Sequence, residues 1–429
     1  MVRDIVLRHA ARIVARVVLA ALIGVSPLYG CATPRRLPAV PPKLETQVAP
    51  IPGPIRFLVV RDTSGLVQEG LNSIAKERAS RASQGLQGPL PPMYMLAISG
   101  GGDDGAFGAG LLNGWTASGT RPEFKVVTGV STGALIAPFA FLGPRYDQAL
   151  RETYTGISQR DIFRPRSLLS GVFGDAMADT TPLQKMVRRW VDQSLLDAIA
   201  AEYAKGRLLL VGTTNLDTLE PVIWNMTAIA ASKDPRAPEL FRKILVASAA
   251  VPAAFPPVLI DVYANGAHYQ EMHVDGGAMT QVFLYPPDIR LQEHAAAAGV
   301  ERQRTLYIIR NARLDADWAS VTRRTLPIAR RAVSSLMQSQ GVGDLFRIYL
   351  TTQRDGIDYN LAFIPSTFDY PRAGQFDTAY MRALFQTGYD MAAKGYPWRK
   401  TPPGYVEPVR ATPSTSRPAE PESSAAPSP

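Results

Sequence analysis

Short apolar runs alternate along the chain with longer stretches in which apolar residues recur at helical spacing. The apolar runs predict strands at residues 55–62, 93–98, 125–130, 207–217, 221–226, 305–311 and 359–365. The helical spacing predicts helices at residues 105–118, 132–142, 181–204, 237–250, 328–353 and 377–394, after an earlier helix that ends near residue 82. Strands that alternate with helices are typical of a parallel sheet. We therefore expect an α/β fold with a mainly parallel central sheet flanked by helices.

The N-terminus has the pattern of an export signal. A basic stretch with four arginines precedes the apolar run VVLAALIGVSPLYG, which is too short to span a membrane comfortably. LYGC at residues 28–31 resembles a bacterial lipobox, in which the cysteine becomes diacylated. We expect a signal peptide at residues 1–30, a lipidated Cys31 and attachment to the cell envelope. Bacterial lipoproteins that stay on the inner membrane typically have an aspartate directly after the lipidated cysteine. This chain has Ala32 at that position, so we expect attachment to the outer membrane. A plain signal peptide or an uncleaved anchor stays open.

Composition divides the rest of the chain. Proline-rich residues 31–54 predict a tether, and the tail at 401–429 is rich in Pro, Ser and Ala, which is typical of disorder. Between them we expect an N-terminal extension at 55–92, a catalytic core at 93–290 and a C-terminal α/β part, residues 291–400, that packs on the core. The sequence predicts no oligomeric state.

Charge and cysteine content exclude some classes of protein. The net charge of +9 falls to about +6 once residues 1–30 are removed. No Arg/Lys cluster with interleaved aromatics accompanies this modest excess, so we expect no nucleic-acid partner. Cys31 is the only cysteine, which excludes an internal disulfide.

Ser131 lies in the stretch FKVVTGVSTGALIAP, between a predicted strand and a predicted helix. A G-x-S-x-G turn, here flanked by Gly129 and Gly133, holds its serine on a strained bend that exposes the hydroxyl. The N-terminus of the following helix favours a negatively charged oxygen nearby. Ser131 is therefore a candidate nucleophile, and a glycine turn with a capping serine is the alternative.

A second glycine-rich stretch, SGGGDDGAFGAGLL, follows the strand predicted at 93–98. Consecutive glycines expose backbone N–H groups that can bind an anion. A phosphate loop is disfavoured because no GK[ST] follows and two aspartates would repel phosphate. We expect Gly100, Gly101 and Gly102 to form an oxyanion hole, because the strand that carries Ser131 should be the next one in the parallel sheet.

The proton acceptor for Ser131 has two candidates. Of the four histidines, His9 leaves with the signal and His294 lies in a polar helical stretch, which leaves His268 and His273. A Ser-His-Asp triad would use His273. The other candidate is Asp275, whose reference pKa near 3.9 makes it a weak base and puts more of the catalysis on the oxyanion hole.

GGGDDG, GVSTG and DGG, in this order and spacing, resemble the patatin-like phospholipases, and ASAAVPAAFPP at 247–257 is similar to a further segment of that family. The resemblance covers residues 93–285 closely. It implies a three-layer patatin-like fold and hydrolysis of lipid acyl esters without metal, cofactor or histidine. Carried over, Ser131 is the nucleophile, Asp275 the general base and Gly100–Gly102 the oxyanion hole. The other motif glycines are Gly105, Gly129, Gly133, Gly276 and Gly277.

Asp104 departs from that family, which usually has Arg or Lys at this position. An acid in place of a cation changes the local charge by two. The sequence therefore favours an acyl-ester hydrolase over an enzyme that recognises the phosphate of a phospholipid. Asp103 and Asp104 are expected to act as helix-start acids. The apolar run at 168–177 is interpreted either as an acyl pocket or cover, or as core.

The expected function is therefore that of a serine hydrolase of lipid acyl esters, with a lipid or acyl ester as substrate and the membrane as partner through the lipidated N-terminus. Three alternatives stay open: a Ser-His-Asp esterase or peptidase that uses His273, a lipid-binding lipoprotein without turnover, and a structural envelope protein tethered by Cys31.

Overall fold

The computed structural model describes residues 36–167, 174–315, 318 and 320–406. The predicted signal peptide, Cys31, residues 168–173 of the apolar run and most of the predicted tail lie outside the described residues. Residues 36–54, predicted as part of a tether, pack on the protein instead: Val40, Val48 and Ile51 are buried, and Ala49 forms a β-bridge with Tyr263. The apolar side chains between the prolines explain this difference.

Among the described residues, nine strands form one sheet, and five consecutive strands that extend to one of its edges are parallel. In spatial order the parallel strands are β6 (Leu208–Asn215), β3 (Val126–Val130), β2 (Met93–Ile98), β10 (Arg304–Arg310) and β11 (Ile357–Phe363). At the other edge the pairing turns antiparallel through β7 (Glu220–Asn225), β1 (Arg56–Phe57), β9 (Ala267–Asp275) and β8 (Val258–Ala264). The short strands β4 (Arg164–Pro165) and β5 (Ala178–Asp179) pair separately.

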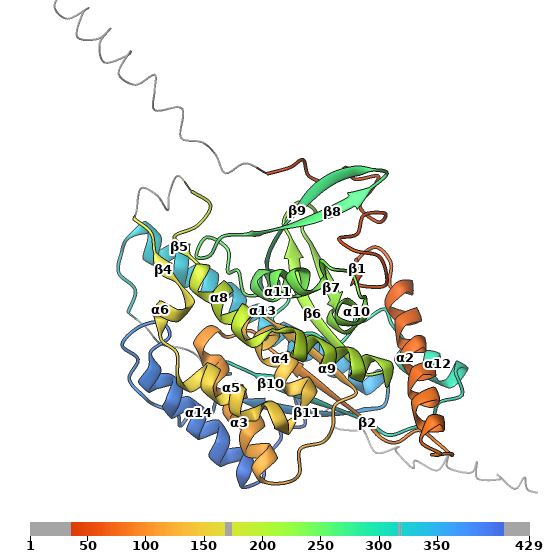
Figure 1. The fold of residues 1–429 in the computed structure, drawn as a ribbon. Coiled ribbons are helices and arrows are strands. Elements are labelled where there is room, and N and C mark those ends of the chain that lie inside the picture. Colours follow the sequence, from red (N-terminus) through yellow and green to blue (C-terminus); the bar gives the residue numbers. More distant parts are fainter. Residues whose placement is uncertain (1–35, 168–173, 316–317, 319, 407–429) are drawn as a thin grey trace, which may run out of the picture.

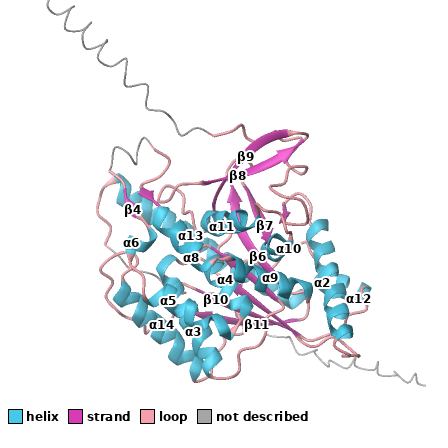
Figure 2. Ribbon diagram, in the orientation of Figure 1, coloured by secondary structure: helices cyan, strands magenta, loops and turns pink. Residues whose placement is uncertain are grey.

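Helices cover both faces of this sheet, which gives three layers (Figures 1 and 2). Apolar side chains of one face pack in a large core against α3 (Gly105–Ala117), α4 (Thr132–Leu142), α5 (Asp147–Thr155), α6 (Gln159–Ile162), α8 (Thr181–Trp190), α9 (Gln193–Ala204), α10 (Met226–Ala231), α11 (Ala237–Ser248) and α14 (Thr378–Ala393). The opposite face packs against α2 (Ser64–Ser83), α12 (Leu291–Ala297) and α13 (Thr325–Arg354). This arrangement confirms the predicted α/β class and its mainly parallel sheet.

Three local predictions differ from the structure. The helix expected at 181–204 is two helices, because Asp192 caps a new helix by accepting a hydrogen bond from the N–H of Leu195. The strand expected at 55–62 pairs only over Arg56–Phe57, and a turn follows. The hairpin of β8 and β9 was not predicted, because polar residues interrupt the apolar pattern of both strands.

The segment from residue 291 onward continues the same sheet. Strand β10 lies between β2 and β11, and α14 packs along α3. The C-terminal ends of β2, β3 and β10 therefore meet at one edge of the sheet; the glycine-rich loop follows β2, Ser131 follows β3, and Asp275 ends β9.

Candidate active site

Ser131 occupies a strained turn between β3 and α4. Its backbone angles are φ 56° and ψ −126°, a left-handed conformation that costs a non-glycine residue about 1–3 kcal/mol. The predicted glycines make the turn possible, because a Cβ on Gly129 would lie 2.5 Å from the carbonyl oxygen of Gly133, and one on Gly133 would lie 2.3 Å from that of Ile98. The turn leaves Ser131 at the N-terminus of α4, largely buried with 8% exposure.

Sheet register brings Asp275 to Ser131. Strand β6 separates their strands, with Gly212 opposite Val130 on one side and Thr213 opposite Asp275 on the other. Asp275 is 1% exposed, and its Oδ1 accepts a hydrogen bond from the N–H of Gly277 at 2.7 Å. Within the described part of the chain, no donor with hydrogen-bond geometry reaches its Oδ2.

Burial dominates the electrostatics of this carboxyl. It raises the pKa of Asp275 from 3.8 to about 7, although the nearby hydroxyl of Ser131 and the N–H of Gly277 both act to lower it. The sequence alone suggested a weak base with an ordinary pKa. The folded chain instead presents a carboxyl that exchanges its proton near neutral pH, where a general base is most effective.

The segment ASAAVP forms hydrogen bonds with both Ser131 and Asp275. The N–H of Ser131 donates to Oγ of Ser248 at 3.0 Å, and that hydroxyl donates to the carbonyl of Gly212 at 2.7 Å. Two residues further, the carbonyl of Ala250 accepts from the N–H of Asp275 at 2.9 Å. The segment was noted in the sequence only as a family resemblance, and its position explains why a serine is required there.

The glycine-rich loop follows β2 and lies against Ser131. A Cβ on Gly100 would come within 3.1 Å of that of Ser131. However, the N–H of Gly100 is donated to the carbonyl of Gln281 at 3.0 Å, so this group is not available to an oxyanion. Among the described residues, no acceptor is bonded to the N–H groups of Gly101 and Gly102. The predicted set of three donors is therefore reduced to two.

Close approach explains the remaining motif glycines and one residue that sequence reasoning missed. A Cβ would lie less than 3.0 Å from a neighbouring atom at Gly105, Gly129, Gly133, Gly276 and Gly277. At Gly101 it would lie 2.1 Å from the carbonyl oxygen of Asn311, which follows β10. The side chain of Asn311 holds this loop by donating to the carbonyl of Ser99 at 2.9 Å.

Asp103 and Asp104 begin the short helix η2 (Gly102–Asp104), but a distant arginine engages both of them. Arg372 forms ion pairs with Asp103 and, at 3.8 Å, with Asp104. Asp103 also accepts from the N–H of Phe376 at 2.7 Å, and Asp104 from the hydroxyl of Tyr380 at 2.7 Å. Arg372 thus brings a positive charge to the glycine loop from a distant segment of the chain. No local sequence pattern predicted this contact.

The histidines do not approach the serine. His273 is fully buried, with Nδ1 2.9 Å from Oγ1 of Thr213 and Nε2 3.2 Å from a carboxylate oxygen of Glu271. His268 stacks on Tyr263. No hydrogen bond joins Ser131 to any of the histidines that the structure describes.

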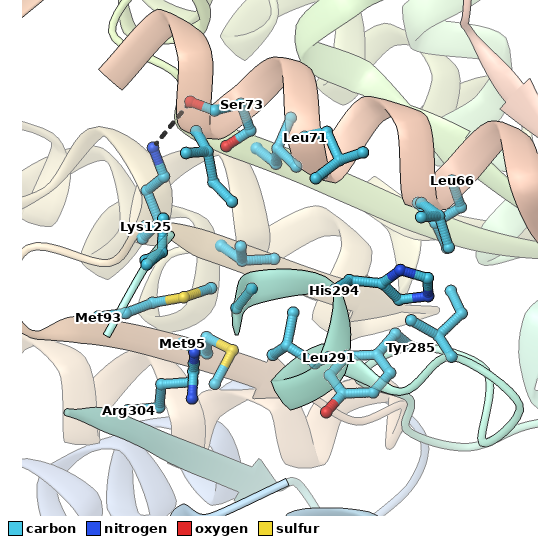
Figure 3. A pocket seen from close by; sticks show the side chains of 18 of the residues that line it. Leu66, Leu71, Ser73, Met93, Met95, Lys125, Tyr285, Leu291, His294 and Arg304 are labelled. Atoms are coloured by element: carbon cyan, nitrogen blue, oxygen red, sulfur yellow. Dashed lines mark hydrogen bonds between the residues drawn. The ribbon is translucent and has the colours of Figure 1, made fainter. Parts of the chain in front are cut away.

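His294 lines a separate apolar cavity of about 120 Å³. Figure 3 shows it between α2 and the starts of the parallel strands, where Lys125 donates to the carbonyl of Ser73 at 3.5 Å. Neither Ser131 nor Asp275 lines it. Across the described residues, no three His, Cys, Asp or Glu side chains gather as metal ligands, and no helix is both long and apolar enough to cross a membrane.

Residues 96–286 match the family model described as patatin-like phospholipase. No curated protein sequence matches the chain. Among solved structures, VipD from Legionella pneumophila is similar with 12% sequence identity and a TM-score of 0.34, over 70% of this chain and 66% of that one. Residues 96–286 therefore form a patatin-like domain, which confirms the resemblance drawn from the sequence motifs.

Proposed function

We propose that the chain is a serine hydrolase of lipid acyl esters in which Ser131 and Asp275 form a catalytic dyad. A patatin-like phospholipase domain indicates a hydrolase of the esterase and phospholipase type. The observation that carries the finer proposal is the buried Oδ2 of Asp275, which has no hydrogen-bond partner among the described residues and belongs to a carboxyl with a pKa of about 7 beside a strained serine.

In the first step, Oγ of Ser131 attacks the carbonyl carbon of the ester while its proton passes to Oδ2 of Asp275. The tetrahedral intermediate then collapses, the bond to the alcohol oxygen breaks, and the protonated Asp275 returns the proton to that oxygen. An acyl-serine and a free alcohol result. The raised pKa supports both halves of this step, because the carboxyl must accept and release one proton near neutral pH.

In the second step, Asp275 takes a proton from a water molecule as that water attacks the acyl-serine. Collapse of this intermediate releases the fatty acid and returns the proton to Oγ of Ser131. The N–H groups of Gly101 and Gly102 and the N-terminus of α4 would stabilise the oxyanion in both steps. Gly100 is left out, because its N–H is already donated to Gln281.

An alkyl fluorophosphonate tests the dyad directly. The intact mass of the purified chain after incubation, with the adduct located by peptide mapping, should show a single phosphonate on Ser131. The adduct should be lost in Asp275→Asn and kept in His273→Ala. Loss in His273→Ala, with the fold intact, would favour the Ser-His-Asp alternative. No adduct on the folded wild type would refute the hydrolase and favour a lipid-binding protein without turnover.

We also propose that the chain is exported and held at the outer membrane by lipid on Cys31. The support is the basic and apolar pattern of residues 1–30 and the LYGC motif. Mass spectrometry of the N-terminal peptide should show a diacylated cysteine at position 31, and Cys31→Ser should move the protein from the membrane fraction to the soluble fraction. An unmodified Cys31 in membrane-bound protein would contradict the proposal.

A further inference from the structure

The first half of α13 exposes apolar side chains to solvent. Leu336 is 71% exposed, and Ile328 and Val333 on the same helix are also exposed. Just before the helix, Trp318 is 87% exposed and Val321 is exposed as well. Single exposed apolar residues are ordinary, but so many within one short stretch mark a surface for interaction.

The apolar side chains share one side of the helix. At about 100° per residue, Ile328, Ala329, Ala332, Val333 and Leu336 fall within an arc of about 140°. All five are exposed. The helix therefore presents its apolar side to solvent.

The opposite side of the same stretch lies nearer the protein. Among the described side chains between Ile328 and Gln338, those of Arg331, Met337 and Gln338 are half-buried. Gln338 donates from Nε2 to the carbonyl of Asp315 at 3.2 Å. This is the reverse of the usual arrangement for a surface helix, whose apolar side packs on the core.

The positive charge around the exposed apolar side of α13 indicates what kind of surface would bind there. Residues 318–343 contain Arg323, Arg324, Arg330 and Arg331 and no aspartate or glutamate. Arg323 and Arg324 are exposed. An amphipathic helix with arginines and a neighbouring tryptophan is suited to the interface of a membrane that contains anionic lipids.

The second half of the same helix reaches the candidate active site. The carboxylate of Asp344 accepts from the N–H of Gln281 at 2.7 Å. The carbonyl of Gln281 in turn accepts from the N–H of Gly100 at 3.0 Å. One rigid helix thus connects the exposed apolar face to the glycine loop beside Ser131.

We propose that Trp318 and residues 320–338, referred to here as the docking segment, bind the surface of an anionic lipid bilayer and hold the active-site edge of the sheet toward it. This proposal rests on the proposed hydrolase function, because the docked bilayer would supply the acyl ester. It is independent of an anchor at Cys31, since it concerns a folded surface of the described chain.

Binding is tested with the full chain carrying Cys31→Ser, which removes the acyl anchor, and Ser131→Ala, which prevents turnover. Vesicles of phosphatidylcholine with phosphatidylglycerol are compared with vesicles of phosphatidylcholine alone. The test variants are Val333→Glu with Leu336→Glu, and Arg323→Glu with Arg324→Glu. Leu350→Glu is the matched control, because Leu350 is 63% exposed on the same helix but outside the docking segment. The side chains altered in the test and control variants are exposed, so the thermal unfolding of these variants should match that of the parent.

We expect both double variants to weaken partition onto anionic vesicles by at least about tenfold, since each basic side chain near such a surface contributes measurably to binding. Leu350→Glu should bind like the parent. The parent's tryptophan emission should shift to the blue on binding, and Trp318→Phe should lose most of that shift, which makes the readout local to the docking segment.

Activity separates this proposal from the proposed function. In chains that retain Ser131, the double variants should hydrolyse a soluble short-chain ester at the parent rate and anionic vesicles at least about tenfold more slowly. Double variants that bind vesicles as tightly as Leu350→Glu would overturn the docking segment while soluble hydrolysis still supported the enzyme. A shift from dimer to monomer without loss of vesicle binding would overturn it in favour of a second copy on this face. Normal docking with no hydrolysis of any ester would instead refute the hydrolase.

Discussion

Replacing Asp275 by Asn should stabilise the fold while abolishing activity. The unfolded chain loses the Asp275 proton near the ordinary pKa of 3.8, whereas the folded chain keeps it until about pH 7, because burial disfavours the charged form. Between these values the unfolded state binds fewer protons, so the stability of the wild type falls as pH rises. An asparagine at 275 carries no charge at any of these pH values and avoids the loss.

The difference between the two pKa values, about 3 units, sets the size of the effect. At about 1.4 kcal/mol per unit, the ionised carboxylate costs the folded state about 4 kcal/mol above pH 7. Near pH 4 the cost is only a fraction of that, since the folded carboxyl is protonated and the unfolded one has only begun to lose its proton. The stability gained by Asp275→Asn should therefore be small near pH 4, grow through pH 5–6 and level off above about pH 7.

Urea unfolding of both proteins at pH 4.5, 6 and 8, followed by fluorescence, measures this difference. Asp377→Asn is a control of opposite sign, because backbone N–H groups of Ala373, Tyr380 and Ala379 hold the pKa of Asp377 below its ordinary value. That variant should be less stable than wild type at neutral pH, with the gap closing in acid. A stability difference for Asp275→Asn that is constant with pH, or negative at pH 8, would refute burial as the cause of the raised pKa.

Four further predictions concern the same site. With a soluble ester, kcat/KM should rise with pH through an apparent pKa of about 7, because only the ionised Asp275 accepts a proton; a flat profile between pH 5 and 8 would contradict this. His273→Ala should keep kcat while lowering stability in urea by about 1–3 kcal/mol, since both ring nitrogens are bonded inside the core. Gly101→Ala should lower kcat by about 10²–10³, because its Cβ would displace the loop from Asn311. Arg372→Gln should lower kcat on a neutral soluble ester and Arg372→Lys should restore part of it, because the charges of Asp103 and Asp104, no longer countered by Arg372, would oppose an oxyanion; equal kcat in the Gln variant and wild type would argue against this charge effect.

The parts of the site that the sequence predicted depend on local backbone geometry. The turn at Ser131 and the loop at Gly100–Gly102 each have a short glycine pattern in the sequence. Glycine is required there for steric reasons that are the same in any such turn after a strand. Parallel strands were predicted from apolar runs because they are buried on both faces. These features need no knowledge of distant residues.

The parts that were missed depend on contacts between distant segments. Ser248 supports Ser131 across 117 positions, and Arg372 pairs with Asp103 across 269. Neither residue type is unusual in its local sequence. The same holds for the pKa of Asp275, which is set by burial after β9 has paired with β6. The helix at 181–204 was predicted too long for a local reason instead, since its amphipathic pattern continues through a capped break at Asp192.

The two glycines after Asp275 help its buried carboxyl to act as a base near neutral pH. A fully buried carboxylate without donors would stay protonated at neutral pH, whereas one with several donors would return to its ordinary pKa and lose its strength as a base. Here one backbone donor, the N–H of Gly277, reaches Oδ1 at 2.7 Å and leaves Oδ2 open. A Cβ on Gly277 would lie 3.0 Å from Oδ1 of Asp275 and 2.7 Å from Nε2 of Gln281, so a larger residue would push the donor away. Burial raises the pKa of Asp275, and the hydroxyl of Ser131 together with the single backbone donor of the DGG motif limits that rise, so the pKa stays near neutrality.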